Sequence, residues 1–259
     1  MATANIHVDV ARKDGVATLT LHGHKSVNLI NRALMAELIK TASPLHNDPD
    51  VRLIIVTGPP GGSFIGGADI GEMQALNSHT AREFIQQLHA ACHVFRTLPV
   101  PSIARIEGLC LGGGMELAAA CDIRVGAHNS RYGMPEVQVG LPSVIEAALL
   151  PSLIGWGRTR ELLYRGHIIS ATEAERIGFL QHVAPEGKLD ETLAPIIDDI
   201  LRAEPNAIRA QKRLIEGWLE TDLNTGIEAS INAFSDNFLT DTPNKRLAAF
   251  FDSKKQKTF

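Results

Sequence analysis

The first half of the chain alternates short apolar runs with longer segments of helical periodicity. Residues 6–10 and 16–21 flank a Lys-Asp-Gly turn, which predicts a hairpin of two strands. Residues 51–57 (VRLIIVT) are almost continuously apolar and end at a Gly- and Pro-rich segment, which is typical of a strand buried on both faces. Two further strand-like runs cover residues 103–109 and 122–127. The pattern predicts a mainly buried sheet.

Segments of helical periodicity separate these strands and make up most of the chain after residue 142. Leu34, Leu38 and Ile39 repeat at helical spacing within residues 28–46, and an apolar face marks residues 81–98 before two prolines. Only residues 181–184 have strand character after residue 142. The remaining predicted helices are 115–121, 143–154, 158–164, 171–177, 190–202, 205–220, 223–239 and 243–255, with Pro142, Pro205 and Pro243 at first-turn positions. The expected class is α/β with an α-rich last third.

Three consecutive glycines, Gly112, Gly113 and Gly114, stand between a strand-like run and a helix-forming run. Backbone N–H groups at such a helix N-terminus have no partner within the helix and favour negative charge. Without Cβ atoms, the turn lets a polar oxygen of a ligand approach the main chain closely. By glycine count alone, a simple tight turn is almost as good an explanation as an anion pocket.

Two glutamates flank this feature. Glu116 falls in the first turn of the predicted helix, where it either complements the helix dipole or serves chemistry; a capping box fails because Gly113 stands three positions earlier. Its neighbours are apolar, so its carboxylate is expected near a dry interior. Glu136 follows Pro135 and is either a solvated loop residue or a partner in acid–base catalysis. The residues alone leave both alternatives open.

Composition limits the function classes. The chain has 259 residues, 44% hydrophobic and 21% charged, with a net charge of −4, which implies no general attraction to nucleic acid or to anionic membranes. Three cysteines are too few for a disulfide framework and are expected to be buried thiols. The N-terminal residues lack a signal-peptide core, and no apolar run reaches membrane-span length, so a cytoplasmic location is expected.

Other catalytic templates are not met. The dinucleotide fingerprint, the phosphate loop and the Gly-x-Ser-x-Gly elbow are missing from the sequence. His22, His24, His46 and His89 have no partner at metal-ligand or nucleophile–base spacing, and no metal site is expected. Glu146 is expected to face solvent or to cap a helix, with a third active-site carboxylate as the alternative. The lysines at positions 254, 255 and 257 are a solvated tail or an anchor for phosphate.

The segment IARIEGLCLGGGMELAAACDIRVGA, followed by YGMPEVQVGLP, resembles the crotonase superfamily, the enoyl-CoA hydratase and isomerase family. The similarity extends to HKSVNLINRAL, FIGGADIGEM, LIGWGRTRELL and AAFFDSKK, and so covers nearly the whole chain. The resemblance implies a spiral of ββα units over residues 1–200 and a C-terminal helical oligomerisation region over residues 201–259, forming trimers or hexamers.

The resemblance also implies the parts of the site. The backbone N–H groups of Ala68 and Gly113 would form an oxyanion hole. Glu116 would orient and deprotonate a water, and Glu136 would enter protonated and deliver a proton to Cα. Coenzyme A would be part of the substrate, with no metal or redox cofactor. The residues implied to bind it are Lys25, Ser26, Val27, Gly66, Asp69, Ile70, Gly112, Pro135 and Lys254.

Both glutamates of the family's hydratases are matched here, whereas isomerases often retain only the second. The predicted function is therefore enoyl-CoA hydration through an oxyanion-stabilised enolate. One segment departs from the family: residues 142–146 read PSVIE where hydratases usually have Pro-Gly-x-Gly-Gly. The alternatives are a double-bond isomerase, an acyl-CoA hydrolase or decarboxylase using Glu136 or Glu146 as base, or a non-catalytic binding protein, which the acidic balance disfavours.

Overall fold

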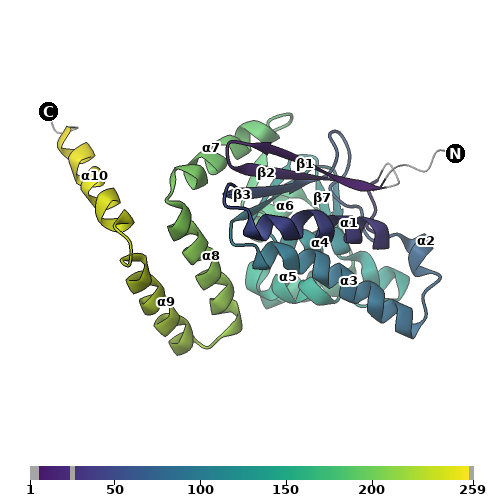
Figure 1. Ribbon diagram of the computed structural model, residues 1–259. Coiled ribbons are helices and arrows are strands. Elements are labelled where there is room, and N and C mark those ends of the chain that lie inside the picture. Colours follow the sequence, from purple (N-terminus) through teal and green to yellow (C-terminus); the bar gives the residue numbers. More distant parts are fainter. Residues whose placement is uncertain (1–5, 24–26, 257–259) are drawn as a thin grey trace. The chain divides into compact units, whose positions relative to one another are not determined.

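The computed structural model describes residues 6–23 and 27–256, and the chain divides into two compact units, Met1–Arg202 and Ala203–Phe259. The first unit holds the sheets and the second holds three helices (Figure 1). The mixed α/β architecture of parallel strands followed by C-terminal helices confirms the predicted fold class. The roles expected for residues 1–200 and 201–259 stay predictions.

Two sheets form the first unit. In the larger, the strands are ordered β1-β2-β3-β4-β6-β9; β1 and β2 form the predicted antiparallel hairpin, and the other neighbours pair in parallel. Its strands are β1 (His7–Lys13), β2 (Val16–His22), β3 (Leu53–Thr57), β4 (Ser102–Ile106), β6 (Ile123–Ala127) and β9 (His182–Ala184). The smaller sheet holds β5 (Leu109–Leu111), β7 (Arg131–Gly133) and β8 (Ile168–Ser170). Strands β4 and β6 are each followed by a strand of the smaller sheet, which generates successive turns of a spiral.

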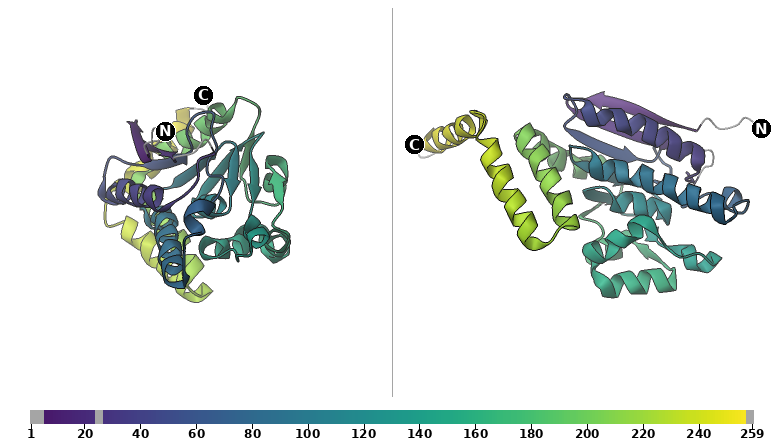
Figure 2. Two further views of the ribbon diagram at one scale, coloured as in Figure 1. Left: turned by 90° about the vertical axis from the view of Figure 1, so that its right-hand side faces the viewer. Right: turned by 60° about the horizontal axis from the view of Figure 1, so that its bottom comes forward.

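Helices cover both faces of the larger sheet. Successive side chains of a strand point to opposite faces. Leu53 and Ile55 of β3 therefore join a small cluster with Leu189 and Leu193 of α7, while Ile54 lies in the main core on the other face. That core is shared with α1 and α3, which pack together (Figure 2). The helices of this unit are α1 (Arg32–Ala42), α2 (Ile70–Met73), α3 (Ser78–Thr97), α4 (Gly113–Ala119), α5 (Leu150–Arg165), α6 (Ala171–Arg176) and α7 (Leu189–Arg202).

Three 3-10 helices complete the first unit: η1 (Ser43–Asn47), η2 (Pro135–Val139) and η3 (Ile145–Leu149). The second unit consists of α8 (Pro205–Glu220), α9 (Leu223–Asn237) and α10 (Thr242–Gln256), close to the predicted bounds. Of the described residues, no helix is long and apolar enough to cross a membrane.

The predicted helix at residues 143–154 is wrong in its first half. Residues 141–144 are not helical, η3 follows, and α5 begins only at Leu150. Ile145 has φ +41°, a conformation that a β-branched residue rarely adopts and that interrupts any helix. Pro142 therefore does not stand in a first helical turn. The three-residue strands β7 and β8 were also not predicted, because so short a run has no readable period.

Candidate active site

The glycine turn begins helix α4 with an unusual backbone. Gly112 is the N-cap residue, with φ +52° and ψ −123°, which glycine alone adopts without strain. A Cβ built on Gly112 would lie 2.4 Å from Oε1 of Glu136, and one on Gly114 would lie 2.5 Å from the carbonyl oxygen of Ile65. The absence of a side chain at Gly112 therefore leaves room for the carboxylate of Glu136, and its absence at Gly114 leaves room for the backbone of Ile65.

Ala68 approaches this turn from a second loop. Ile30 donates its N–H to the carbonyl of Gly67 (2.9 Å) and accepts from the N–H of Asp69 (2.8 Å), so the N–H of Ala68 lies on the opposite edge of this short strand. A Cβ on Gly112 would lie 4.0 Å from Cα of Gly67, which places the two loops side by side.

Neither the Ala68 N–H nor the Gly113 N–H donates a hydrogen bond to any described residue. Gly113 is the first residue of α4, where a main-chain donor has no intrahelical partner. The two amides predicted for the oxyanion hole thus belong to adjacent loops and are both available to a ligand oxygen.

Glu116 is buried, with 4% of its surface exposed, and its Oε1 has no hydrogen-bond partner among the described residues. The expectation of a dry surrounding is correct. Burial raises the pKa of this carboxyl from 4.5 to about 8, and the charge of Glu136 adds to the increase. The backbone amides of Ala147 and Val144 lower the pKa by a smaller amount.

Glu136 comes from a different element, η2, in which Pro135 occupies the first position. Its side chain is only partly buried, and its Oε2 accepts a hydrogen bond of 2.8 Å from Oγ of Ser143. Ser143 belongs to the segment that departs from the family pattern, and its contribution to Glu136 was not predicted from the sequence. Oε1 of Glu136 lies above Gly112, at the start of α4.

The two carboxylates therefore differ in environment. Burial and the nearby charge of Glu136 both favour the protonated form of Glu116, whose pKa is raised to about 8. The expected roles, Glu116 toward the water and Glu136 toward Cα, stay predictions. Local sequence could not supply the raised pKa of Glu116, because the amides and the second carboxylate that set it come from residues 136–147.

Glu146 is the third carboxylate, and the expectation that it faces solvent is wrong: 3% of its surface is exposed. Its Oε1 lies 2.8 Å from Nδ1 of His89, and its Oε2 has no partner among the described residues. Burial raises the pKa of Glu146, while His89 and Arg96 lower it. His89, expected to be without a partner, lies on α3, far away in sequence.

The residues predicted to bind coenzyme A gather partly around the same loops. A Cβ on Gly66 would lie 2.4 Å from Cγ1 of Val27, which shows how closely the two segments pack. Ile70 is 65% exposed, whereas the buried Asp69 caps α2 by accepting from the N–H of Gly71 at 3.0 Å. The remaining predicted binding residues Lys25 and Ser26, and the side chain of Lys254 in α10, lie outside the described residues.

Asn28 ties these loops together, a role that sequence reasoning missed. It is buried and has φ +54°. Its Oδ1 accepts from the N–H of Gly23 (2.6 Å), and its Nδ2 donates to the carbonyls of Leu21 (3.1 Å) and Phe64 (2.7 Å). One side chain thereby fixes the turn after β2 against the loop that carries Ala68.

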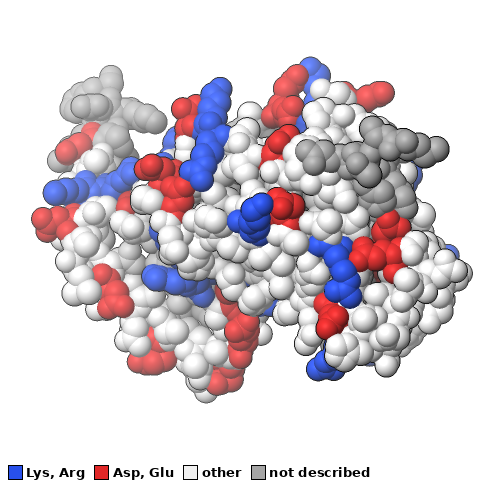
Figure 3. Space-filling model, turned by 45° about the vertical axis from the view of Figure 1, so that its right-hand side comes forward, with Lys and Arg blue, Asp and Glu red and all other residues white. Residues whose placement is uncertain are grey.

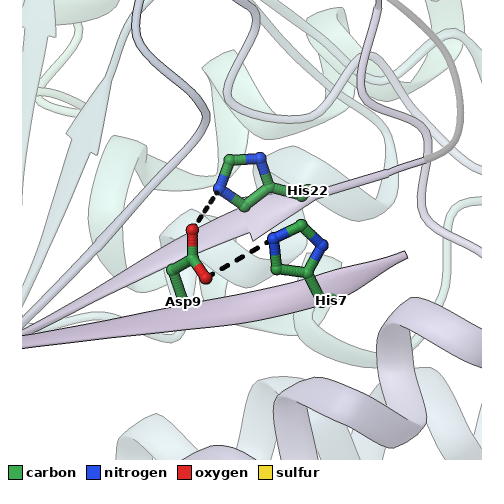
Figure 4. A group of neighbouring side chains, drawn as sticks. All are labelled: His7, Asp9 and His22. Carbon is green, nitrogen blue, oxygen red and sulfur yellow. Dashed lines mark ion pairs between the residues drawn. The ribbon is translucent and has the colours of Figure 1, made fainter. Parts of the chain in front are cut away.

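A second polar cluster lies on the β1–β2 hairpin (Figure 4). His7 and His22 face each other across the hairpin with rings stacked at 4.4 Å, and Asp9 lies within 3.4 Å and 3.1 Å of them. The expectation that His22 lacks a partner is therefore wrong. Strand pairing, which brings positions 7 and 22 together, was the available signal. The ligand atoms lie within 4.8 Å of one another, a spacing that a transition metal could bridge.

The surface charge and the thiols agree with the sequence analysis. Figure 3 shows Lys and Arg side chains interspersed with Asp and Glu, and the coloured residues of that face form no continuous basic patch. Cys92, Cys110 and Cys121 are buried free thiols, as predicted.

Comparison with known proteins agrees with the fold. The family model described as enoyl-CoA hydratase/isomerase matches residues 11–258. A crotonyl-CoA hydratase of Syntrophomonas wolfei is 33% identical over 98% of both chains. A short-chain-enoyl-CoA hydratase of Clostridium acetobutylicum is 32% identical over 96% of this chain and 97% of its own length.

Solved structures of enoyl-CoA hydratases are also similar to this chain over nearly its whole length. An enoyl-CoA hydratase of Bacillus anthracis superposes with a TM-score of 0.90 at 30% identity, covering 95% of this chain and 96% of the other. The protein belongs to the enoyl-CoA hydratase/isomerase family, as the sequence resemblance predicted.

Proposed function

We propose that this protein is an enoyl-CoA hydratase, which adds water across the conjugated double bond of an α,β-unsaturated acyl-CoA. Coenzyme A enters as part of the substrate. The proposal rests on two carboxylates from different elements, Glu116 and Glu136, with unequal surroundings at the N-terminus of one helix. The hydratase names of the full-length relatives support the same reaction class.

The chemistry requires a place for negative charge. Attack of water at Cβ turns the thioester into an enolate, whose oxygen would accept hydrogen bonds from the N–H groups of Ala68 and Gly113. A main-chain donor of this kind contributes about 3 kcal/mol to stabilisation of the transition state. The start of α4 adds the positive end of a helix dipole, although α4 is short.

We assign the two carboxyl roles as the resemblance to the family implies. Glu116 takes the proton of the attacking water, and Glu136, beside Gly112 and held by Ser143, gives a proton to Cα. One proton moves onto the enzyme pair and one moves off it, so the reaction is balanced with water as the second substrate.

The test is hydration of crotonyl-CoA, followed by loss of the absorbance of the conjugated thioester. E116Q and E136Q should each lower kcat/KM by at least about 10²-fold while remaining folded by circular dichroism, because each removes one proton-transfer group. E191Q, on the exposed surface of α7, is the matched control and should retain activity. Full activity in both site variants would refute the proposal.

A further inference from the structure

One face of the β1–β2 hairpin carries two histidines and an aspartate. His7 and Asp9 are two positions apart on β1, and His22 is the residue of β2 directly opposite His7, so the three side chains leave the same face of the hairpin. The alternating residues Val8 and Leu21 pack in the main core on the other face. Because paired strands fix the backbone of all three polar residues, their side chains start from well-defined positions.

Both histidines direct a ring nitrogen at the carboxylate of Asp9 (Figure 4). Nε2 of His22 lies 3.1 Å from Oδ2 of Asp9, and Nε2 of His7 lies 3.4 Å from Oδ1. The ligand atoms of a tetrahedral ion with bonds of about 2.0 to 2.2 Å lie roughly 3.3 to 3.6 Å from one another. One ligand atom from each side chain lies within 4.8 Å of the other two, so small side-chain rotations would make room for an ion.

Nε2 of His22 is a polar atom without a hydrogen bond. It has almost no contact with solvent, and although Oδ2 of Asp9 is 3.1 Å away, this nitrogen has no hydrogen-bond partner among the described residues. Buried polar atoms are normally paired. A metal ion that accepts the lone pair of this nitrogen would satisfy it.

The carboxylate of Asp9 is available to a cation. Its ion pairs within the described chain are with His7 and His22, and no described lysine or arginine competes for it. An ion can reach the group from solvent, because the side chain of Asp9 is 64% exposed and that of His7 is 38% exposed. Two imidazoles with one carboxylate suit zinc and related transition metals, whereas Mg²⁺ and Ca²⁺ prefer several oxygen ligands.

We propose that His7, Asp9 and His22 bind a divalent transition metal ion such as Zn²⁺. Nε2 of each histidine and a carboxylate oxygen are the ligands, and water completes the coordination, since no fourth His, Cys, Asp or Glu among the described residues joins the group. The ion would link the first residue of β1 to the last residue of β2 and so hold an edge strand of the larger sheet. Metal binding here does not depend on the hydratase function.

Titration of the metal-stripped protein, free of any polyhistidine tag, with Co²⁺ tests the site. We expect one Co²⁺ per chain, with the visible absorption bands of a bound ion, which one equivalent of Zn²⁺ abolishes and which Mg²⁺ and Ca²⁺ leave unchanged. Zn²⁺ should also raise the Tm of the unaltered protein, because the ligands are brought together only in the folded hairpin.

Three variants remove one ligand each. H7Q, D9N and H22Q should each weaken Zn²⁺ binding, measured by calorimetry, at least about tenfold, since even loss of an outer-shell partner of a metal ligand costs that much. H79Q is the matched control, because His79 lies 3.6 Å from Glu83 in an exposed His–carboxylate pair on α3; it should bind Zn²⁺ as the unaltered protein does. Circular dichroism checks that the variants fold, and the exposed D9N keeps the test valid if a histidine variant does not.

Two results would overturn the metal site. One is failure of the unaltered protein to bind Co²⁺ or Zn²⁺ at millimolar concentration. The other is binding that H7Q, D9N and H22Q leave unchanged, or that H79Q weakens equally, since the ion would then lie elsewhere or bind without specificity. Neither result involves turnover of an acyl-CoA, so failure of the metal site and failure of the hydratase function are distinguishable.

Discussion

At the scale of single residues, the buried carboxyl of Glu116 sets the chemistry. Removing a carboxylate from water penalises its charged form, and a second negative charge close by adds to the penalty. Both effects act on Glu116, and the few amides around it do not offset them. The consequence is a carboxyl whose pKa is raised to about 8.

The pH dependence of hydration follows from this pKa. If ionised Glu116 takes the proton of the water, kcat/KM should rise as the pH rises through about 8, where this carboxyl ionises. Initial rates with crotonyl-CoA in buffers of constant ionic strength provide the measurement. A rate that instead falls through pH 8 would mean that the protonated form of Glu116 is active, contrary to the roles proposed here.

Unfolding experiments check the same pKa without catalysis. A folded-state pKa of about 8 against 4.5 when unfolded gives stability that is complete below pH 4.5 and is lost as the pH rises to about 8. E116Q has no carboxyl to ionise at this position, so its stability does not decrease in this way. Its free energy of unfolding should therefore improve relative to the unaltered protein over this range, by roughly 1.4 kcal/mol per pH unit at most.

At the scale of elements, the glycine turn places the carboxylates. Its strand–turn–helix character could be predicted from residues 103–121, and α4 does begin at Gly113. The sequence also pointed to Glu116 and Glu136, through their relation to that turn. It could not show that a side chain on Gly112 would meet Glu136, because that contact depends on how η2 returns to α4.

Replacement of Gly112 tests the turn. G112A should lower kcat/KM for hydration by about tenfold or more, because the added methyl would lie 2.4 Å from Oε1 of Glu136 and displace it. The strained φ of +52° should also cost about 1 to 3 kcal/mol of stability. Kinetic assays and thermal unfolding measure the two effects.

G187A is the matched control for backbone strain. Gly187 has φ +69°, and a Cβ there would meet nothing within 4 Å. It should lose comparable stability and keep its activity. Equal activity in both variants would show that Gly112 does not make room for a catalytic group.

The segment from Ser143 to Glu146 shows where sequence reasoning stops. Helical spacing in residues 143–154 predicts one continuous helix, but the positive φ of Ile145 interrupts it, and Glu146 is buried. Neither the contact of Ser143 with Glu136 nor that of Glu146 with His89 could be predicted, because each is made by residues distant along the chain or on separate elements. The feature of the sequence that pointed to this segment was the departure of residues 142–146 from the family pattern.

At the scale of the whole molecule, the second unit carries apolar surface. A groove of about 680 Å³ between α8 and α9 is lined by Trp218, Leu223, Ile227, Ile231 and Phe234, among others. Phe234 is 71% exposed. Large exposed apolar groups of this kind are typical of association surfaces. We infer that this unit joins subunits into the trimer or hexamer that the family resemblance implied.

Light scattering tests this inference. F234E should shift the assembly towards monomers, because a charge would be buried at the contact. E228Q, a change on the same helix, is the control. If the unaltered protein is monomeric at micromolar concentration, the inference is contradicted.

The central claim is that water is added across a conjugated thioester by the Glu116 and Glu136 pair. Incubation of crotonyl-CoA with the protein in water labelled with heavy oxygen, followed by mass spectrometry of the thioester, tests it most directly. The account predicts a 3-hydroxyacyl-CoA containing one labelled oxygen, formed by the unaltered protein and lost in E116Q and E136Q. An unlabelled thioester with a moved double bond, or free coenzyme A with a labelled acid, would contradict it.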